Sequence, residues 1–213
     1  MRFDIITIFP HIFDSYINES LVKRAREKKV ISINVHNLRD YSKGRHQKVD
    51  DKPFGGGPGM VLQVEPITRA VQKIKAKNKK TRVVLFSTRG KTFEQKTARR
   101  LSKYDQIIMI CGRYEGVDER VAEHIADEEI SMGEYVLSGG ELPALVLLEA
   151  TARFLPGFLG KQESLEDIKG YYPTYTRPPE TVIKGKKRRV PEVLTSGNHA
   201  LITAWRHRLG KRK

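Results

Sequence analysis

Short apolar runs rich in β-branched residues alternate with segments of helical spacing, and this alternation limits the fold more than any other feature. Residues 2–9 form the first such run, which stops at Pro10, and residues 11–28 then place apolar side chains at helical spacing. Further strands are predicted at 31–35, 82–86, 106–111 and 128–131, and further helices at 67–74, 93–103, 117–125 and 142–154. This alternation predicts an α/β fold with a mostly parallel sheet flanked by helices.

The segment 39–60 is polar and glycine-rich without periodicity, so it is predicted to be a long loop. Loops of that length in compact domains are usually functional or mobile. Its glycine run at 55–59 is open to two interpretations, a phosphate cradle or a plain hinge. The run 90–92 is similar to the end of a P-loop, but Leu85 stands where that motif needs glycine, which excludes a P-loop NTPase.

The character of the chain changes after Pro156. Residues 157–180 hold several prolines and little apolar periodicity, which is typical of a linker. Beyond them lie a basic cluster at 184–189 and one predicted helix near 200–208, with Ser196 or Asn198 as its N-cap. We therefore expect a domain at 1–160, a linker at 161–177 and a small basic C-terminal unit at 178–213.

Charge and cysteine content restrict the partner and the compartment. The chain has 40 Lys and Arg against 25 Asp and Glu, a net charge of +15 that favours nucleic acid as a partner, although other protein classes share such a balance. The single cysteine, Cys111, excludes an intramolecular disulfide and fits a reducing cytosol, and the apolar run before it predicts a buried strand end. The sequence shows neither a signal peptide nor a stretch of transmembrane length, so we expect a cytoplasmic protein without membrane contact.

Two glycine-rich segments, 111–120 and 131–143, directly follow predicted strands. In open α/β sheets, ligands bind beyond the carboxyl ends of strands, where small residues allow the backbone to approach a ligand closely. These segments are therefore the predicted pocket.

Together with four other ordered motifs, these segments make the chain similar to the bacterial tRNA (guanine-N1)-methyltransferases, the TrmD family of the SPOUT class. The other motifs lie at 49–60, 153–157, 175–178 and 196–199. The resemblance covers nearly the whole chain, and several long motifs in order are far more specific than any single one. It favours a functional loop over a hinge at 55–59.

The resemblance implies a SPOUT fold in which segments around 85–140 form a deep trefoil knot, followed by a shortened helical C-terminal domain. It also implies that S-adenosyl-L-methionine (SAM) binds bent inside the knot, mainly through backbone contacts. The implied SAM-binding residues are Leu85, Ser87, Gly112, Tyr114, Glu115, Gly116, Ser131, Met132, Gly133, Tyr135, Leu137, Gly139 and Gly140.

The implied reaction is methylation of N1 of guanosine 37, beside the anticodon. Guanine N1 carries a proton that a base must remove, and Asp167 matches the general base of the family. An exposed Asp is a weak base, so ordering against the substrate would have to raise its basicity. Arg153 matches the arginine that supports this base and the charge developing on guanine O6. Glu115 is a candidate for placing magnesium, although one carboxylate cannot define a metal site.

The resemblance also implies partners. Asp50 and the loop glycines Gly55, Gly56, Gly57 and Gly59 would gather the splayed target base. Lys187 and Arg188, with the basic segment 206–213, would contact tRNA phosphates, or would be disordered basic tails. The family works as an antiparallel homodimer with the active site between subunits, so a monomer should be inactive.

The chain departs from the family at three places. Fewer residues than usual separate Asp167 from the motif at 175–178, the C-terminal domain stops soon after Trp205, and residues 87–90 replace the usual Ser-Pro-Gln-Gly. Two alternatives stay open: a non-catalytic RNA-binding module, and a SPOUT methyltransferase acting on ribosomal RNA or a ribose hydroxyl. A small-molecule enzyme is disfavoured by the charge.

Overall fold

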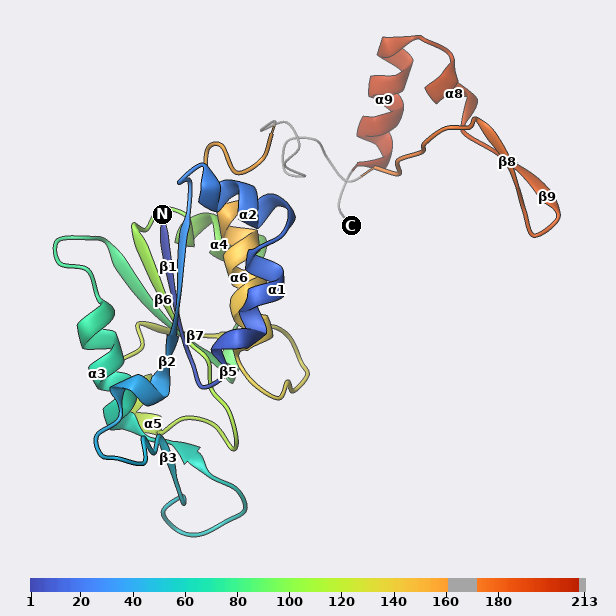
Figure 1. Ribbon diagram of the computed structural model, residues 1–213. Coiled ribbons are helices and arrows are strands. Elements are labelled where there is room, and N and C mark those ends of the chain that lie inside the picture. The colour runs from blue at the N-terminus through green and yellow to red at the C-terminus, as the bar shows by residue number, and fades with distance from the viewer. Residues whose placement is uncertain (161–171, 211–213) are drawn as a thin grey trace. The chain divides into compact units, whose positions relative to one another are not determined.

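The computed structural model describes residues 1–160 and 172–210, and the chain divides into two compact units, Met1–Leu159 and Gly160–Lys213. The first unit is built on a five-stranded sheet in which every neighbouring pair of strands is parallel (Figure 1). In spatial order the strands are β2 (Ser32–Asn37), β1 (Arg2–Thr7), β6 (Gln106–Ile110), β5 (Thr81–Thr92) and β7 (Glu128–Ser131). The predicted α/β fold with a mostly parallel sheet is confirmed.

Helices cover both faces of this sheet (Figure 1). One face packs on α1 (Asp14–Ile17), α2 (Ser20–Glu27), α4 (Gln95–Leu101) and α6 (Glu141–Ala152), and the other on α3 (Val64–Ile74) and α5 (Glu119–His124). Two 3-10 helices, η1 (Pro10–Phe13) and η2 (Leu38–Tyr41), complete the layers. All five residues of β6 are buried, because its alternate side chains enter the two separate apolar clusters.

Three details differ from the sequence prediction. The helix expected over 11–28 is divided into η1, α1 and α2, with a positive φ of 51° at Ser20. Strand β5 continues to Thr92 instead of ending at Phe86, and its register with β7 shifts so that Phe86 and Lys91 both lie opposite Ile130. The loop predicted over 39–60 also contains η2 and the short β3 (Asp50–Asp51), which pairs antiparallel with β4 (Val61–Leu62).

A buried carboxylate joins the three strands on one side of the sheet. Asp4 is fully buried in β1, where its Oδ1 accepts hydrogen bonds from Arg2 and Asn34 and lies 2.8 Å from His36 Nε2. Its Oδ2 accepts a hydrogen bond from Gln106 Nε2 at 2.7 Å. Burial by itself raises the pKa of Asp4, but the hydrogen bonds from His36, Arg2 and Gln106 outweigh burial and hold this pKa below its usual value.

The described part of the second unit contains a hairpin and two helices. Strands β8 (Glu180–Ile183) and β9 (Lys186–Arg189) pair antiparallel around Lys184 and Gly185, which both have positive φ. Helix α8 (Glu192–Thr195) precedes α9 (His199–Leu209), and Asn198 Oδ1 accepts a hydrogen bond from Leu201 N at the start of α9. Asn198 is therefore the N-cap, whereas the hairpin was missing from the predicted helical unit. In the described ranges, no helix is long and apolar enough to cross a membrane.

Candidate functional site

A cavity of about 500 Å³ lies beyond the carboxyl ends of β6 and β7 and beside residues 85–89 of β5. Its walls come from residues 85–89 and 112–117, from α5, and from residues within 129–143. This is the position at which open parallel sheets bind ligands. The two glycine-rich segments identified in the sequence therefore meet around one cavity.

Twelve of the thirteen residues expected to bind SAM line this cavity. The twelve are Leu85, Ser87, Gly112, Tyr114, Glu115, Gly116, Ser131, Met132, Tyr135, Leu137, Gly139 and Gly140. Gly133 does not line it; its N–H donates a hydrogen bond to Ser131 Oγ at 3.2 Å, and its backbone packs against the Tyr135 ring.

The two glycine-rich segments touch through their backbones. Gly140 N donates a hydrogen bond to Gly112 O at 3.1 Å. A Cβ at Gly140 would lie 2.6 Å from Cys111 Cα, closer than atoms of folded proteins approach. Gly140 has an ordinary helical φ of −83°, so glycine is required here by the close approach of the chains and not by backbone conformation.

Cys111 itself is buried at the end of β6, as the sequence predicted. Burial raises the pKa of its thiol well above the usual value. Its side chain therefore packs as a small apolar group.

An ion pair that the sequence analysis missed links the same two segments. Arg113 Nε donates to Glu141 Oε2 at 3.0 Å, and Glu141 Oε1 accepts from Thr7 Oγ1 at 2.7 Å. The Arg113 guanidinium also lies over the ring of Phe9, 4.8 Å from its centroid. Both charged residues stand inside the glycine-rich segments, but no spacing rule pairs residues 28 positions apart.

A second charged pair holds the bulged part of β5, residues 87–90, against α5. Arg89 Nη2 lies 2.5 Å from Glu119 Oε2 and 3.9 Å from Glu129 Oε2. The hydrogen bond to Glu119 raises the pKa of Arg89. Glu129 Oε2 is buried beside the cavity with no hydrogen-bond partner in the described part of the chain. This part of β5 is thus tied to α5 and lies beside an acceptor without a hydrogen-bond donor in the described part of the chain.

The glycine loop after β3 ends against the cavity wall. Glu115 N donates to Met60 O, and Leu62 N donates to Gly116 O, both at 3.0 Å. Gly59, with a φ of 73°, packs directly against the Glu115 side chain. Gly55, Gly56 and Gly57 have positive φ, and Asp50 lies in β3 at the start of the loop. Phe54, which the sequence analysis did not assign, is fully exposed beside these glycines.

The remaining predicted residues are not brought to this cavity. Arg153 caps the carboxyl end of α6, whereas Gly140 and Pro143 border the cavity at its amino end. The 12 residues of α6 separate these ends by about 18 Å. Asp167 lies outside the described residues. Lys187 and Arg188 lie in β9 of the second unit, where Lys187 Nζ is 3.2 Å from Glu180 Oε1.

No group of three or more His, Cys, Asp and Glu side chains suited to a metal ion occurs within residues 1–160 and 172–210. Magnesium at Glu115 stays a prediction from the sequence.

Comparison with known proteins identifies the family. The family model described as tRNA (Guanine-1)-methyltransferase TrmD matches residues 1–213. The tRNA (guanine-N(1)-)-methyltransferase of Geobacter sulfurreducens is 47% identical over 97% of this chain and 84% of the relative. The enzymes of that name from Staphylococcus carnosus and Ruminiclostridium cellulolyticum are 47% and 46% identical over 97% of this chain, and the matches cover 84% and 89% of their lengths. The chain belongs to the tRNA (guanine-1)-methyltransferase TrmD family.

Proposed function

We propose that this protein transfers a methyl group from SAM to N1 of guanosine 37 in tRNA, next to the anticodon. The observation that carries the proposal is the gathering of twelve expected SAM residues around one cavity in a chain of this family. The relatives are named for methylation at guanine N1 of tRNA. Because tRNA is the substrate, we place the enzyme in the cytoplasm.

The residues around the cavity fit SAM. A volume of about 500 Å³ lies within the range of small-molecule sites. Tyr114, Tyr135 and Leu137 offer exposed apolar surface for an adenine ring, and Glu129 Oε2 is an acceptor that lacks a donor among the described residues. A Cβ at Gly116 would meet open space, so this backbone leaves room for a ligand. When bound, SAM supplies a methyl group made electrophilic by its sulfonium.

We assign the cavity walls to a deep trefoil knot formed by segments around 85–140. Close backbone crossings support this assignment. A Cβ at Gly90 would lie 2.6 Å from Ile130 N, and one at Gly140 equally close to Cys111 Cα. Residues 87–90 lie within β5 between its two stretches of pairing with β7, where the register shifts, so β5 bulges away from β7 at this point.

In the proposed reaction Asp167 removes the N1 proton, and Arg153 stabilises the negative charge on guanine O6. Arg153 stands about 15 Å along α6 from Pro143, the last residue of this helix that lines the cavity, at 1.5 Å per residue. This distance supports an active site shared between two subunits, in which Arg153 and Asp167 serve the cavity of the partner.

Exposed apolar surface also supports a homodimer. Helix α6 is mostly buried, yet Leu142 and Val146, one turn apart, are 58% and 51% exposed. Phe9, Ile12 and Tyr16 are exposed in and beside η1, which contacts α6. Large exposed apolar patches mark interaction sites, so we propose that this face is covered by a second copy of the chain.

The tRNA contacts are divided between the two units. We assign residues 1–160 to SAM binding, 161–177 to a linker that carries the base, and 178–213 to tRNA binding. In the first unit, Asp50 and the glycines of its loop gather the target base, and the exposed Phe54 ring can stack on RNA. In the second, Lys187 and Arg188 contact phosphates from the exposed strand β9.

The test is transfer of labelled methyl from SAM to an unmodified tRNA transcript with guanosine at position 37, beside a matched transcript with adenosine there. We expect methylation of the guanosine transcript alone, with the label recovered as N1-methylguanosine. Label on a ribose hydroxyl or on ribosomal RNA would instead support another SPOUT activity. SAM binding without transfer to any RNA would support the non-catalytic module.

A further inference from the structure

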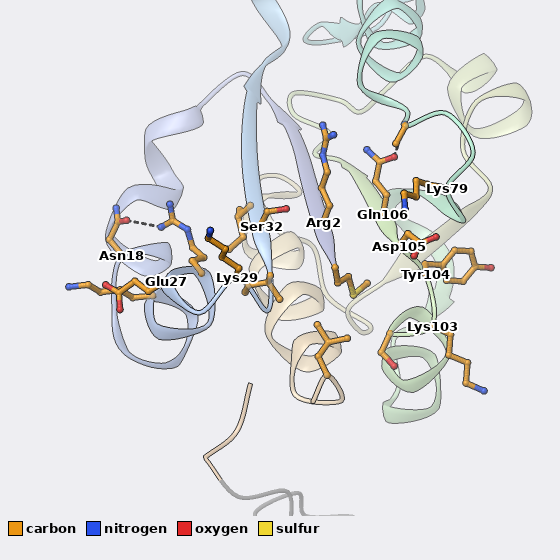
Figure 2. A pocket seen from close by; sticks show the side chains of 18 residues that line it. Arg2, Asn18, Glu27, Lys29, Ser32, Lys79, Lys103, Tyr104, Asp105 and Gln106 are labelled. Atoms are coloured by element: carbon orange, nitrogen blue, oxygen red, sulfur yellow. Dashed lines mark hydrogen bonds between the residues drawn. The ribbon is translucent and has the colours of Figure 1, made fainter. Parts of the chain in front are cut away.

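A second cavity, of about 1060 Å³, lies at the amino ends of the parallel strands (Figure 2). Arg2, Ser32 and Gln106, which pair in register near the starts of β1, β2 and β6, form its floor. The six residues of β1 span about 20 Å, so this cavity and the proposed SAM cavity lie at opposite ends of the sheet.

The lining is strongly basic. Six cationic side chains border the cavity: Arg2, Lys23, Arg26, Lys29, Lys79 and Lys103. Two acidic residues accompany them, Glu27 and Asp105, and Asp105 Oδ2 already accepts a hydrogen bond from the backbone of Lys80.

Two of these cationic side chains are held by hydrogen bonds within the protein, and four are not paired with a carboxylate of the described residues. Arg2 pairs with the buried Asp4, and Arg26 donates to Ile17 O and Asn18 Oδ1. Lys23, Lys29, Lys79 and Lys103, by contrast, have no carboxylate within 4.0 Å in the described parts of the chain, and all four are exposed. Lys29 and Lys79 stand on opposite walls, at the end of α2 and beyond α3 (Figure 2).

We propose that this basic cavity binds the sugar–phosphate backbone of the tRNA substrate, away from the anticodon loop. The proposal rests on the proposed function, which makes tRNA the polyanion that the protein must hold. Lysines without a carboxylate partner carry flexible point charges that can bind phosphate, and such contacts do not depend on the base sequence. Tyr104 is the sole aromatic among the described lining residues, and its ring is covered by Lys80, whose Nζ lies 4.7 Å from the ring centroid. The described lining therefore provides no uncovered aromatic ring on which an RNA base could stack.

Distance supports a contact outside the methylated loop. The 20 Å between the two ends of the sheet corresponds to on the order of six base pairs of a duplex. A helical stem that continues from a loop seated at the SAM cavity is thus long enough to reach the second cavity.

The experiment compares two double charge reversals of equal size. The test pair is Lys29→Glu with Lys79→Glu, and the control pair is Lys73→Glu with Lys96→Glu, two exposed lysines that line neither cavity. The Kd of fluorescein-labelled tRNA is measured between 50 and 200 mM salt. We expect the test pair to bind about tenfold more weakly, with a salt slope smaller by about 1.4 to 1.8 for two lost phosphate contacts. The control pair should lose less than about threefold, through net charge alone.

Equal weakening by both pairs would overturn the proposal, because net charge would then explain the whole effect. Calorimetry with inorganic phosphate gives a second arm. Phosphate binding that the test pair abolishes, with unchanged tRNA affinity, would identify a small-anion site and also overturn it. If the test pair does not fold, Lys23→Glu with Lys103→Glu takes its place on the same lining.

This binding test does not depend on catalysis. Absence of methyl transfer by the wild-type protein would overturn the proposed function, whereas the tRNA affinities of the variants would still decide whether the cavity binds RNA. SAM affinity, measured by calorimetry for each variant, should stay at the wild-type value because the SAM cavity lies at the other end of the sheet.

Discussion

Arg113 and Glu141 form a largely buried ion pair, 3.0 Å between Nε and Oε2, that joins the two glycine-rich segments around the 500 Å³ cavity. Glu141 also holds Thr7 at the end of β1. One carboxylate thus fixes a strand end, the turn after β6 and the start of α6 relative to one another. The shape of the proposed SAM site depends on this pair.

Glu141→Gln should weaken SAM binding. The amide keeps the size of the side chain but leaves the Arg113 charge without its partner, which costs about 3 kcal/mol for a buried pair. We expect SAM affinity to fall roughly tenfold and urea-induced unfolding to shift accordingly. Thr7→Val is the comparison variant, because it keeps the Arg113–Glu141 pair and removes the two hydrogen bonds of the Thr7 hydroxyl, one donated to the Glu141 carboxylate and one accepted from Phe9 N. The bond to the carboxylate is worth about 1.5–3 kcal/mol. Unchanged SAM affinity in Glu141→Gln, measured by calorimetry, would show that the pair does not shape the site.

Gly140→Ala should disrupt the same region by steric overlap. The added methyl would lie 2.6 Å from Cys111 Cα, so one of the two backbones must move. Overpacking of this kind costs about 1–3 kcal/mol, and we expect SAM affinity to fall with stability. Gly160→Ala is the control, since its added Cβ has no heavy atom within 4 Å. Thermal unfolding and calorimetry measure both effects, and equal behaviour of the two variants would contradict the crossing described here.

The central strands β1 and β6 were predictable because their side chains are buried on both faces of the sheet. The runs of β1 and β6 are nearly continuous and apolar, and β7 has the bounds that the sequence indicated. Two features were not predictable. The extension of β5 depends on its register with β7, and Asp4 is buried because its hydrogen-bond partners come from β2 and β6, which only the folded sheet brings together.

The glycines that line the cavity could be predicted from the sequence, but the ion pairs around it could not. Gly112 and Gly140 belong to recognisable motifs, whereas the pairing of Arg113 with Glu141, or of Arg89 with Glu119, depends on the folded path of the chain. Resemblance to a family supplied the proposed SAM residues as a set. Alternation of strands and helices located only the edge of the sheet where they meet.

Asp4→Asn should destabilise the protein in a pH-dependent way. The pKa of Asp4 is lowered in the folded state, so its ionised form contributes stability that is present above the unfolded pKa of about 3.9 and is lost as the pH falls toward the folded pKa. We expect a loss of about 2–4 kcal/mol at pH 7 that shrinks below about pH 4. Urea unfolding at pH 7, 5, 4 and 3 measures it. Asp14→Asn, at an exposed carboxylate, should change stability little, and a loss for Asp4→Asn that does not vary with pH would refute the assigned role.

Phe54→Ala should weaken tRNA binding without changing the fold. The ring is fully exposed, so its removal leaves thermal unfolding and SAM affinity at their wild-type values. If the ring stacks on a base, the loss is about 1–3 kcal/mol, equal to roughly 5- to 150-fold in tRNA affinity. Phe54→Tyr keeps an aromatic ring and should bind tRNA normally. Equal tRNA affinity of the alanine variant and wild type would remove Phe54 from the substrate surface.

Asp167→Ala should abolish methyl transfer while SAM still binds, because no other group is proposed to take the N1 proton. The shared active site makes a sharper prediction for mixtures. Gly140→Ala subunits have an impaired SAM cavity but keep Asp167, whereas Asp167→Ala subunits have an intact SAM cavity but lack the base. If the base serves the cavity of the partner, each mixed dimer contains one intact site, so equal mixing after co-refolding should restore about a quarter of wild-type activity.

Two measurements make this mixing experiment decisive. Purification in tandem of differently tagged subunits establishes that mixed dimers form. Glu166→Ala, at the neighbouring acid, is the control, and this variant should transfer methyl groups without being mixed with another variant. Inactive mixed dimers would place Asp167 and the SAM cavity of one site in the same subunit. The separation of Arg153 from the cavity along α6 would then need to be closed by a rearrangement within one chain.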